Sequence, residues 1–255
     1  MDLSEFYDCY WAARDDNVDQ SRLDLIVALV REGERVLQVD SGPGMLARRL
    51  RAKGAIVTAT DLSLIAVERA RQKGLDAQQV SLDDELLPFP DEAFDCVISD
   101  SAIEHLFFYH KALVECVRVL RPGGRLVLLL PNIGHWRFRL WLLAGRFPYI
   151  KDSPTDVTHL RFFTLYEGRR LCEKVGLKVR RTDGSAGLWT KGLYPPFLRR
   201  RIARRIYARA ARIWPSLFAR DFILLCEKLS PSPRPAAREA SAPEVTTSLA
   251  GMSSR

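Results

Sequence analysis

The sequence predicts an α/β fold, a doubly wound and mostly parallel seven-stranded sheet. Short apolar runs alternate along the chain with segments of helical periodicity, which is the layout of a parallel sheet covered by helices on both faces. Most of these runs are too apolar to have one face in water. With 255 residues, the chain is long enough to bury a complete core.

Strands and helices are predicted to alternate in chain order. The strands cover residues 35–40, 56–60, 79–82, 95–99, 125–130, 177–182 and 221–228. Two early helices end at glycines, which accept the left-handed conformation of a helix terminus, and a later one begins where Thr164 and Glu167 have capping-box spacing. The predicted helices cover residues 45–53, 63–73, 111–120, 133–145 and about 164–175.

The net charge of +8 comes from one segment. Residues 184–220 hold nine basic residues, one Lys and eight Arg, and no acidic residue. Within 198–214, arginines surround an apolar set at helical spacing, which predicts a basic amphipathic helix. Three interpretations stay open: contact with an anionic membrane or a lipid-linked substrate, packing on its own domain, and contact with a protein partner. Nucleic acid is not expected because no aromatic platform accompanies the arginines. The apolar set is Leu198, Ile202, Ile206, Ala210 and Ile213.

Several other protein classes are disfavoured. No apolar run approaches the roughly 20 residues of a membrane span, and the polar N-terminus does not resemble a signal peptide, so a cytoplasmic protein is expected. Five scattered cysteines without CxxC spacing argue against a disulfide framework or a zinc site, and no metal site is predicted. The Ser-, Pro- and Ala-rich residues 230–255 are expected to form a disordered tail. The oligomeric state is not indicated.

The stretch VLQVDSGPG, residues 36–44, predicts a strand followed by a ligand-binding turn. In an open parallel sheet, small ligands bind beyond the carboxyl ends of the strands, and a cofactor crossing this turn needs bare backbone, which Gly42 and Gly44 provide. The second strand ends about 20 residues further on at Asp61, a carboxylate suited to the hydroxyls of a ribose. The loop lacks the GxGxxG spacing of a dinucleotide dehydrogenase.

Four motifs in fixed order carry a family resemblance. VLQVDSGPG, ATDLS, DDELLPFPDEAFDCVISDSAIEHL and LRPGGRLVLLLPN, within residues 36–132, resemble a class I S-adenosylmethionine-dependent methyltransferase of the type 11/12-like group. The later stretch GRFPYIKDSPTDVTHLRFFT resembles a branch of that family often found beside glycosyltransferases. The resemblance implies a Rossmann-like methyltransferase fold with S-adenosyl-L-methionine as cofactor.

The resemblance also implies roles for individual residues. The backbone at Asp40, Gly42 and Gly44 would hold the methionine part of the cofactor, and Asp61, followed by Leu62, would hold the ribose. Asp83 would bind the adenine amino group with the amide of Asp84 beside it, and Asp100 would line the site. The chain departs from the family pattern at two positions, with Gln38 in place of an acid and Asp40 in place of the first glycine. Asp40 either restores the missing negative charge or intrudes on the cofactor.

Two histidines are candidates for a general base, because the pKa of an imidazole lies near the working pH. Glu104 and His105 begin a helix beside the expected methyl group, and His159 has Asp156 three residues before it. The alternative is that each imidazole only hydrogen-bonds loop backbone. Arg22 either reaches the cofactor or lies at the surface, and the aromatic residues of 136–149 either line an acceptor pocket or pack in the core.

The predicted organisation is one methyltransferase domain over residues 1–229, with a cofactor core at 33–132, an acceptor-side insertion at 133–175 and the basic insert at 184–220. The expected function is methyl transfer to a small or lipid-linked acceptor, with O-methylation of a glycan- or quinone-like compound favoured. The alternative is a catalytically silent protein of this fold that acts as a membrane-associated or complex-forming partner. Under either reading, the basic helix allows peripheral contact with the inner face of the membrane.

Overall fold

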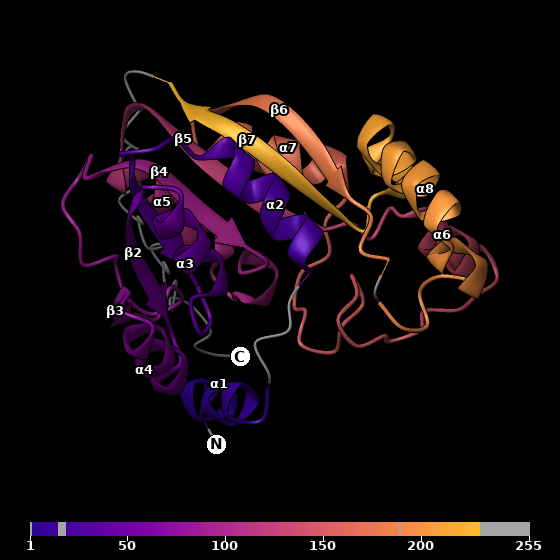
Figure 1. Cartoon of the computed structure of the whole chain (residues 1–255), viewed down its shortest axis with the longest axis horizontal. Coiled ribbons are helices and arrows are strands. Elements are labelled where there is room, and N and C mark those ends of the chain that lie inside the picture. Colours follow the sequence, from indigo (N-terminus) through magenta and orange to yellow (C-terminus); the bar gives the residue numbers. More distant parts are fainter. Residues whose placement is uncertain (1, 15–18, 189, 230–255) are drawn as a thin grey trace, which may run out of the picture.

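A seven-stranded sheet crosses the middle of the molecule (Figure 1). The computed structural model describes residues 2–14, 19–188 and 190–229 and gives the strand order β3-β2-β1-β4-β5-β7-β6. Pairs among β1 to β5 are parallel, whereas β7 runs antiparallel to both β5 and β6, which confirms the predicted mostly parallel sheet. The strands are β1 (Arg35–Val39), β2 (Ile56–Asp61), β3 (Asp76–Gln79), β4 (Phe94–Asp100), β5 (Leu120–Pro131), β6 (Leu177–Ser185) and β7 (Asp221–Lys228).

The predicted helices are present as α3 to α7, and the basic segment forms α8. The hydroxyl of Thr164 caps α7 by accepting from the Glu167 amide, at 3.3 Å. The helices are α1 (Leu3–Ala12), α2 (Gln20–Leu29), α3 (Met45–Ala52), α4 (Leu64–Gln72), α5 (Tyr109–Val119), α6 (Trp136–Leu143), α7 (Leu165–Lys174), α8 (Arg201–Ile213) and α9 (Pro215–Phe218), with 3₁₀ helices η1 (Ile103–His105) and η2 (Pro196–Arg199).

The core has two layers, because successive residues of a strand point to opposite faces of the sheet. Leu37 and Val39 of β1 pack with buried residues of α5 and α7 on one face. Val36 packs with residues of α2, α3 and α4 on the other. Helices therefore cover both faces, and the carboxyl ends of the parallel strands are left as the edge where a ligand site can form.

A smaller apolar cluster lies at one end of the sheet, where α6 and α8 form a lobe (Figure 1). Phe138 of α6 and Tyr207 of α8 are buried in it, and the Trp136 indole N–H donates to the Tyr207 hydroxyl at 2.7 Å. The chain enters this lobe as α6 after β5 and returns to the sheet as α7 and β6. It enters the lobe again as α8 and leaves it into the antiparallel β7. The lobe therefore stands at the same edge of the sheet as the carboxyl ends of β1 to β5.

Two local predictions differ from the structure. The third strand is β3 at Asp76–Gln79 and not residues 79–82, because the apolar Val80 and Leu82 that suggested the later range are buried in the loop that follows the strand. Helix α1 was not predicted at all, although Asp2 and Glu5 form a capping box at its start. The predicted tail at 230–255 lies outside the described residues, and the domain boundaries stay predictions.

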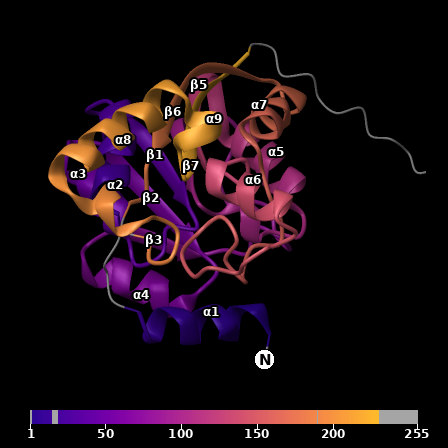
Figure 2. The same ribbon diagram turned by 90° about the vertical axis from the view of Figure 1, so that its right-hand side faces the viewer.

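Helix α1 lies below the sheet edge and beside α4 in both views (Figures 1 and 2). Tyr7, Tyr10 and Trp11 of this helix are half-buried, but it contains no fully buried residue, so core packing does not hold it in place. Polar contacts do: the Asp8 carboxylate accepts from the Ser63 hydroxyl and from the Ile65 amide, at the start of α4. An acid at a helix N-terminus is favoured by the unpaired amides and the helix dipole there.

Candidate active site

A cavity of about 250 Å³ opens at the carboxyl edge of the sheet. It joins two walls, which we call the cofactor wall (residues 38–42, 61–62 and 81–83) and the acceptor wall (residues 104–105 and 152–159). All three predicted catalytic residues line it: His105, Asp156 and His159. So do most of the predicted cofactor residues, namely Gln38, Asp40, Gly42, Asp61, Leu62, Asp83 and Asp100.

Asp61 sits at the end of β2 and is fixed by backbone. Its carboxylate accepts from the Gly42 amide at 2.7 Å and from the Ser63 amide at 2.9 Å, which ties the two turns of the cofactor wall together. Burial raises the pKa of Asp61 to about 6, while these two amides act to lower it. Four lone-pair positions and two donors leave this carboxylate able to accept from a ligand's hydroxyls.

The two glycines of the turn are both needed by the protein itself. Gly42 has a φ of +55°, and a Cβ there would come within 2.7 Å of the Trp11 ring of α1. Gly44 has a φ of +78°, and its Cβ would meet Leu75 and Ala70. Gly44 does not line the cavity, so the structure gives it a packing role between α3 and its neighbours.

Asp40 adopts a left-handed conformation that a non-glycine residue rarely takes, with φ at +46°. Burial, followed by the charges of Asp61 and Asp83, raises the pKa of its carboxyl well above the ordinary range. Beside it, the Gln38 side-chain oxygen is buried and has no hydrogen-bond partner within the described residues. The turn thus presents an unpartnered carbonyl and a carboxyl group that a cationic ligand would favour in its charged form.

Asp83 and Asp84 have different environments. Asp83 is buried, and its carboxylate accepts from the amides of Phe107 and Phe108, at 2.9 and 2.6 Å. Asp84 is exposed, lies outside the cavity lining and accepts from the Ser81 hydroxyl. The adenine role implied for Asp83 stays a prediction. In that role, the Asp83 carboxylate would accept from the adenine amino group while it also accepts from the Phe107 and Phe108 amides.

Arg22 reaches the cavity from α2 and pairs with Asp100 at the end of β4, with 3.3 Å between the charged atoms. The other Asp100 oxygen and the Arg22 Nε have no partner among the described residues. Burial raises the pKa of Asp100, and the charge of Arg22 opposes that rise. Arg22 is therefore part of the site and not a surface residue.

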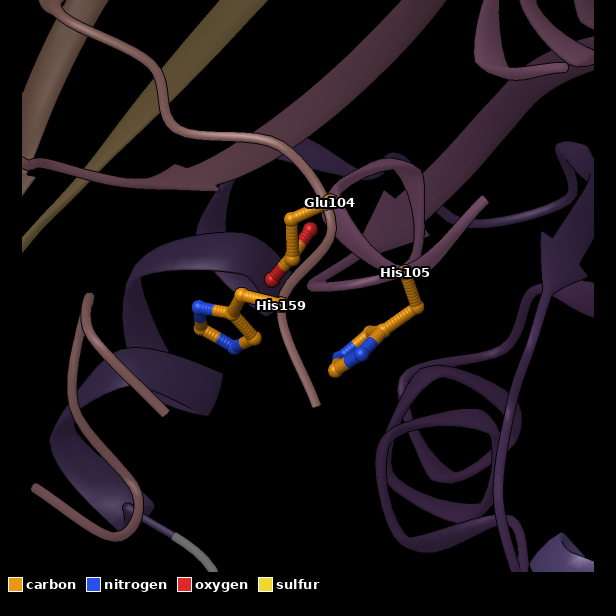
Figure 3. A group of neighbouring side chains, drawn as sticks. All are labelled: Glu104, His105 and His159. Carbon is orange, nitrogen blue, oxygen red and sulfur yellow. The ribbon is translucent and has the colours of Figure 1, made fainter. Parts of the chain in front are cut away.

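The acceptor wall brings Glu104, His105 and His159 together (Figure 3). The His105 and His159 rings meet edge to face, with 4.9 Å between their centroids. Burial lowers the pKa of His105 to about 4, and burial also lowers that of His159. Both imidazoles are therefore neutral at neutral pH. The two segments are joined because the Glu104 carbonyl accepts from the amides of Leu160 and Arg161.

Asp156 shapes the loop that carries His159. Its carboxylate accepts from the Asp152 amide and from both the amide and the hydroxyl of Thr158. These bonds lower the pKa of Asp156 against the opposing effect of burial. The described contacts do not include a hydrogen bond between this carboxylate and the His159 ring, so Asp156 acts on the site by holding the loop.

Sequence reasoning missed the contribution of α1. Tyr7, Tyr10 and Trp11 line the cavity from this helix, and the Tyr7 ring meets His105 edge to face at 6.3 Å. The capping box followed by aromatic residues at helical spacing was the available signal. The aromatic residues of α6 and the following loop do not line the cavity: Trp136, Phe138 and Trp141 belong to the lobe's cluster, and Tyr149 is exposed.

The residues of the cofactor wall fit S-adenosylmethionine. Asp61 has acceptor capacity for a ribose, Gln38 offers an unpartnered buried oxygen, and Asp40 supplies a carboxyl group where the cofactor's cationic end is expected. Among the helices of the described chain, none has the length and apolar character needed to span a bilayer.

Comparison with known proteins finds similarity to methyltransferases. Residues 37–128 match the family model described as "Methyltransferase domain". A demethylmenaquinone methyltransferase of Thermus thermophilus is 41% identical over 109 residues, which cover 40% of this chain and 50% of that protein. A Mycolicibacterium smegmatis protein named "Probable S-adenosylmethionine-dependent methyltransferase" is 32% identical over 177 residues, covering 69% of this chain and 62% of that protein. The chain thus spans only part of the length of these relatives.

Solved structures share the fold at lower identity. A SAM-dependent methyltransferase of Archaeoglobus fulgidus aligns with a TM-score of 0.59 and 16% identity, over 89% of this chain and 100% of that one. A Thermotoga maritima protein, titled a SAM-dependent methyltransferase and possible histamine N-methyltransferase, aligns with a TM-score of 0.58 and 19% identity, over 82% and 88%. At this level of identity, the likeness concerns the fold alone.

Proposed function

We propose that this chain is a class I S-adenosylmethionine-dependent methyltransferase and that it methylates an oxygen of a small or lipid-linked acceptor. The observation that carries the proposal is the single cavity in which Asp61 and the paired histidines face one space. When bound, S-adenosylmethionine supplies a methyl group on a cationic sulfur, which is already a good leaving group. The protein then has to align the two partners and assist loss of the acceptor's proton.

The cofactor wall would bind and orient the nucleoside. Asp61 would accept from its ribose hydroxyls while Gly42 and Ser63 keep the carboxylate in place. Gln38 and Asp40 would face the methionine end, where a cation favours ionisation of the Asp40 carboxyl. Trp11 and Tyr7 of α1 would cover the bound nucleoside and reduce its contact with water.

Residues of the acceptor wall would accept the proton that the acceptor's hydroxyl group loses. His105 and His159 are neutral and part-buried, and each has one ring nitrogen bonded to a backbone carbonyl. A neutral imidazole with one N–H donated keeps its other nitrogen free to accept. These two residues are therefore the proposed activators of an acceptor hydroxyl, with Asp156 holding the loop of His159.

A quinone-like or glycan-like acceptor is proposed on two grounds. The Thermus relative is named for a menaquinone precursor, and the lobe of α6 and α8, at the same edge of the sheet as the cavity, presents a basic, partly apolar surface. Ile202, Ile206 and Ile213 of α8 are 74, 65 and 68% exposed, whereas the helix packs through Tyr207 and Ala211. The predicted apolar stripe is thus largely unused for packing, which favours contact with an anionic membrane beside a lipid-linked acceptor.

Calorimetry with S-adenosylmethionine tests the enzyme proposal. Purified protein should bind the cofactor, and Asp61→Ala should weaken binding at least about 100-fold, because two charge-assisted hydrogen bonds to the ribose are lost. Asp84→Ala is the matched control, since this neighbouring loop acid is exposed and outside the cavity. Absence of binding at millimolar cofactor would remove the proposal.

Vesicle co-sedimentation tests the membrane contact. Vesicles containing phosphatidylglycerol should bind the protein, and vesicles of phosphatidylcholine alone should not. Reversing Arg204, Arg205 and Arg209 to Glu should reduce binding at least about 100-fold, since each basic residue near an anionic surface contributes roughly 1 kcal/mol. Arg170→Glu, on the exposed side of α7, is the control. Equal binding of the triple variant and the wild type would contradict the contact.

The catalytically silent alternative rests on Asp40, whose carboxyl group stands in the cavity at a position of backbone strain. Measurement of turnover distinguishes an active methyltransferase from a catalytically silent protein of the same fold. Formation of S-adenosylhomocysteine with a hydroxylated quinone or glycan acceptor would exclude the silent reading. Cofactor binding without product from such acceptors, together with intact vesicle binding, would favour it.

A further inference from the structure

The side chains of Glu104, His105 and His159 lie closer together than the proposed role of the two histidines in accepting a proton requires. Each residue offers one potential ligand atom, and these three atoms lie within 4.8 Å of one another (Figure 3). The residues come from η1 and from the loop at 152–161, which the chain brings together through the Glu104 carbonyl. Two imidazoles and one carboxylate are a donor set that binds divalent transition metals.

Both imidazoles are oriented by backbone in the way that metal-ligating histidines are. His105 Nδ1 lies 3.0 Å from the Thr158 carbonyl oxygen, and His159 Nδ1 lies 3.1 Å from that of Pro154. A carbonyl oxygen only accepts, so Nδ1 carries the proton in each ring and Nε2 keeps a free electron pair. Donation of the other ring N–H to a carbonyl is the usual outer contact of a metal-bound histidine.

Glu104 supplies the independent sign of a missing ligand. Its side chain is fully buried, yet neither carboxylate oxygen has a hydrogen-bond partner among the described residues. The other buried glutamate, Glu115, accepts from the Leu87 amide and pairs with Arg118. Burying an unpartnered carboxyl group is costly, and buried acids are normally paired or coordinate a metal.

We propose that Glu104, His105 and His159 bind a divalent transition-metal cation, and that this cation holds the acceptor oxygen during methyl transfer. Three protein ligands leave at least one coordination position for an acceptor. Two nitrogen donors favour Zn²⁺, Fe²⁺, Co²⁺ or Ni²⁺ over Mg²⁺, which prefers oxygen ligands. Only the role in methyl transfer rests on the proposed function; binding of the cation does not.

The cation would activate the acceptor as a Lewis acid. Coordination lowers the pKa of a bound hydroxyl, so its proton passes to water at neutral pH. The oxygen's electron pair forms the new bond to the methyl carbon. The pair of the broken carbon–sulfur bond stays on sulfur, which becomes neutral. In this form of the site the two histidines hold the metal and do not take the proton themselves.

Cobalt titration of the untagged, chelator-treated full chain tests the site, because Co²⁺ bound by nitrogen and oxygen ligands absorbs visible light. One equivalent should bind with a dissociation constant in the micromolar range or lower, and Zn²⁺ should displace it. Glu104→Gln and His159→Ala should each weaken binding at least about 10-fold. His110→Ala, which removes an exposed histidine on α5, should leave binding unchanged.

Three outcomes would overturn the metal site: no saturable binding, binding unchanged in both variants, or an equal loss in His110→Ala. Thermal unfolding of each variant shows whether it is folded. Cofactor binding is measured by calorimetry on the same chelated samples. Cofactor binding and turnover without metal would leave the proposed function standing and refute the metal's role. Metal binding without cofactor binding would leave the metal site standing and refute both the proposed function and the metal's role in it.

Discussion

On the cofactor wall, Asp61 and Asp83 each accept two backbone amides, whereas on the acceptor wall the buried Glu104 accepts none within the described residues. All three carboxyl groups line one cavity. The difference is that Asp61 and Asp83 already have hydrogen-bond partners and Glu104 does not. Backbone amides already partner the first two groups, and a neutral hydroxyl or amine can be added to them. The third group still lacks the positive charge or donor that burial demands.

The largest expected effect is on stability, and it concerns Asp83, whose carboxylate already accepts two backbone amides. Asp83→Ala should lower the free energy of unfolding by about 3 kcal/mol, because the part-buried amides of Phe107 and Phe108 lose a charged acceptor and each such bond contributes about 1.5–3 kcal/mol. Urea unfolding monitored by circular dichroism would measure it. Asp84→Ala in the exposed neighbour should change stability by less than about 0.5 kcal/mol. Equal effects of the two substitutions would remove the distinction between them.

The comparison of partnered and unpartnered carboxyl groups can be made with one residue type, by changing each of two buried glutamates, Glu104 and Glu115, to Met. Glu104→Met should raise the stability of the metal-free protein by about 1–2 kcal/mol, since it removes an unpartnered buried carboxyl group. Glu115→Met should lower stability, since Leu87 and Arg118 lose their acceptor. Both are read from the same urea titration. A loss of stability in both variants would mean that Glu104 is satisfied in solution.

The pH dependence of cofactor binding follows from Asp61. Burial raises its pKa to about 6 from the ordinary 3.8. In the proposed contact, only the ionised form would accept both ribose hydroxyls. Affinity should therefore fall about tenfold for each pH unit below about 6. Stability of the ligand-free protein should change in the opposite sense, because a raised pKa stabilises the fold as pH falls from about 6 towards 3.8.

Calorimetry in buffers of different ionisation enthalpy would detect the proton released on binding near pH 6. Asp61→Asn should abolish most of that release, while any remainder is assigned to Asp40, whose pKa is raised in the same direction. If wild-type affinity is constant between pH 5 and pH 7, the ribose contact proposed for Asp61 is wrong.

The smallest expected effect concerns Trp11 of α1, whose ring lies against the cofactor wall. Trp11→Ala should weaken cofactor binding about fivefold, because the ring that lies against Gly42 and lines the cavity is lost. Its effect on global stability should be under about 1 kcal/mol, since α1 buries no residue. Calorimetry and thermal unfolding of the same variant would separate the two. A large drop in melting temperature would show that α1 is part of the core.

Sequence reasoning reached the cofactor wall because its parts are local. A strand, a glycine turn and an acid at the end of the next strand have fixed spacing, so Asp61 and Gly42 could be placed without knowing the tertiary structure. The sheet followed from alternation of apolar runs, apart from the edge strand β3, whose polar residues Asp76, Gln78 and Gln79 carry little apolar signal.

The acceptor wall could not be predicted in the same way. Glu104 and His159 are far apart in the chain, and their meeting depends on a loop held by Asp156 and docked on the Glu104 carbonyl. Nothing in the spacing of these residues expresses that docking. The missing partner of Glu104 is likewise a property of packing, visible only when all neighbouring atoms are placed.

The polar attachment of α1 bears on how ligands would exchange. Detaching this helix breaks the contacts of Asp8 with the start of α4 and exposes half-buried aromatic rings but no fully buried side chain, so it requires far less free energy than opening the sheet. Entry of fresh nucleoside and departure of the spent one are therefore expected to proceed by local opening at this end of the chain. Such a step is often slower than the chemical reaction, and it would then set the turnover rate.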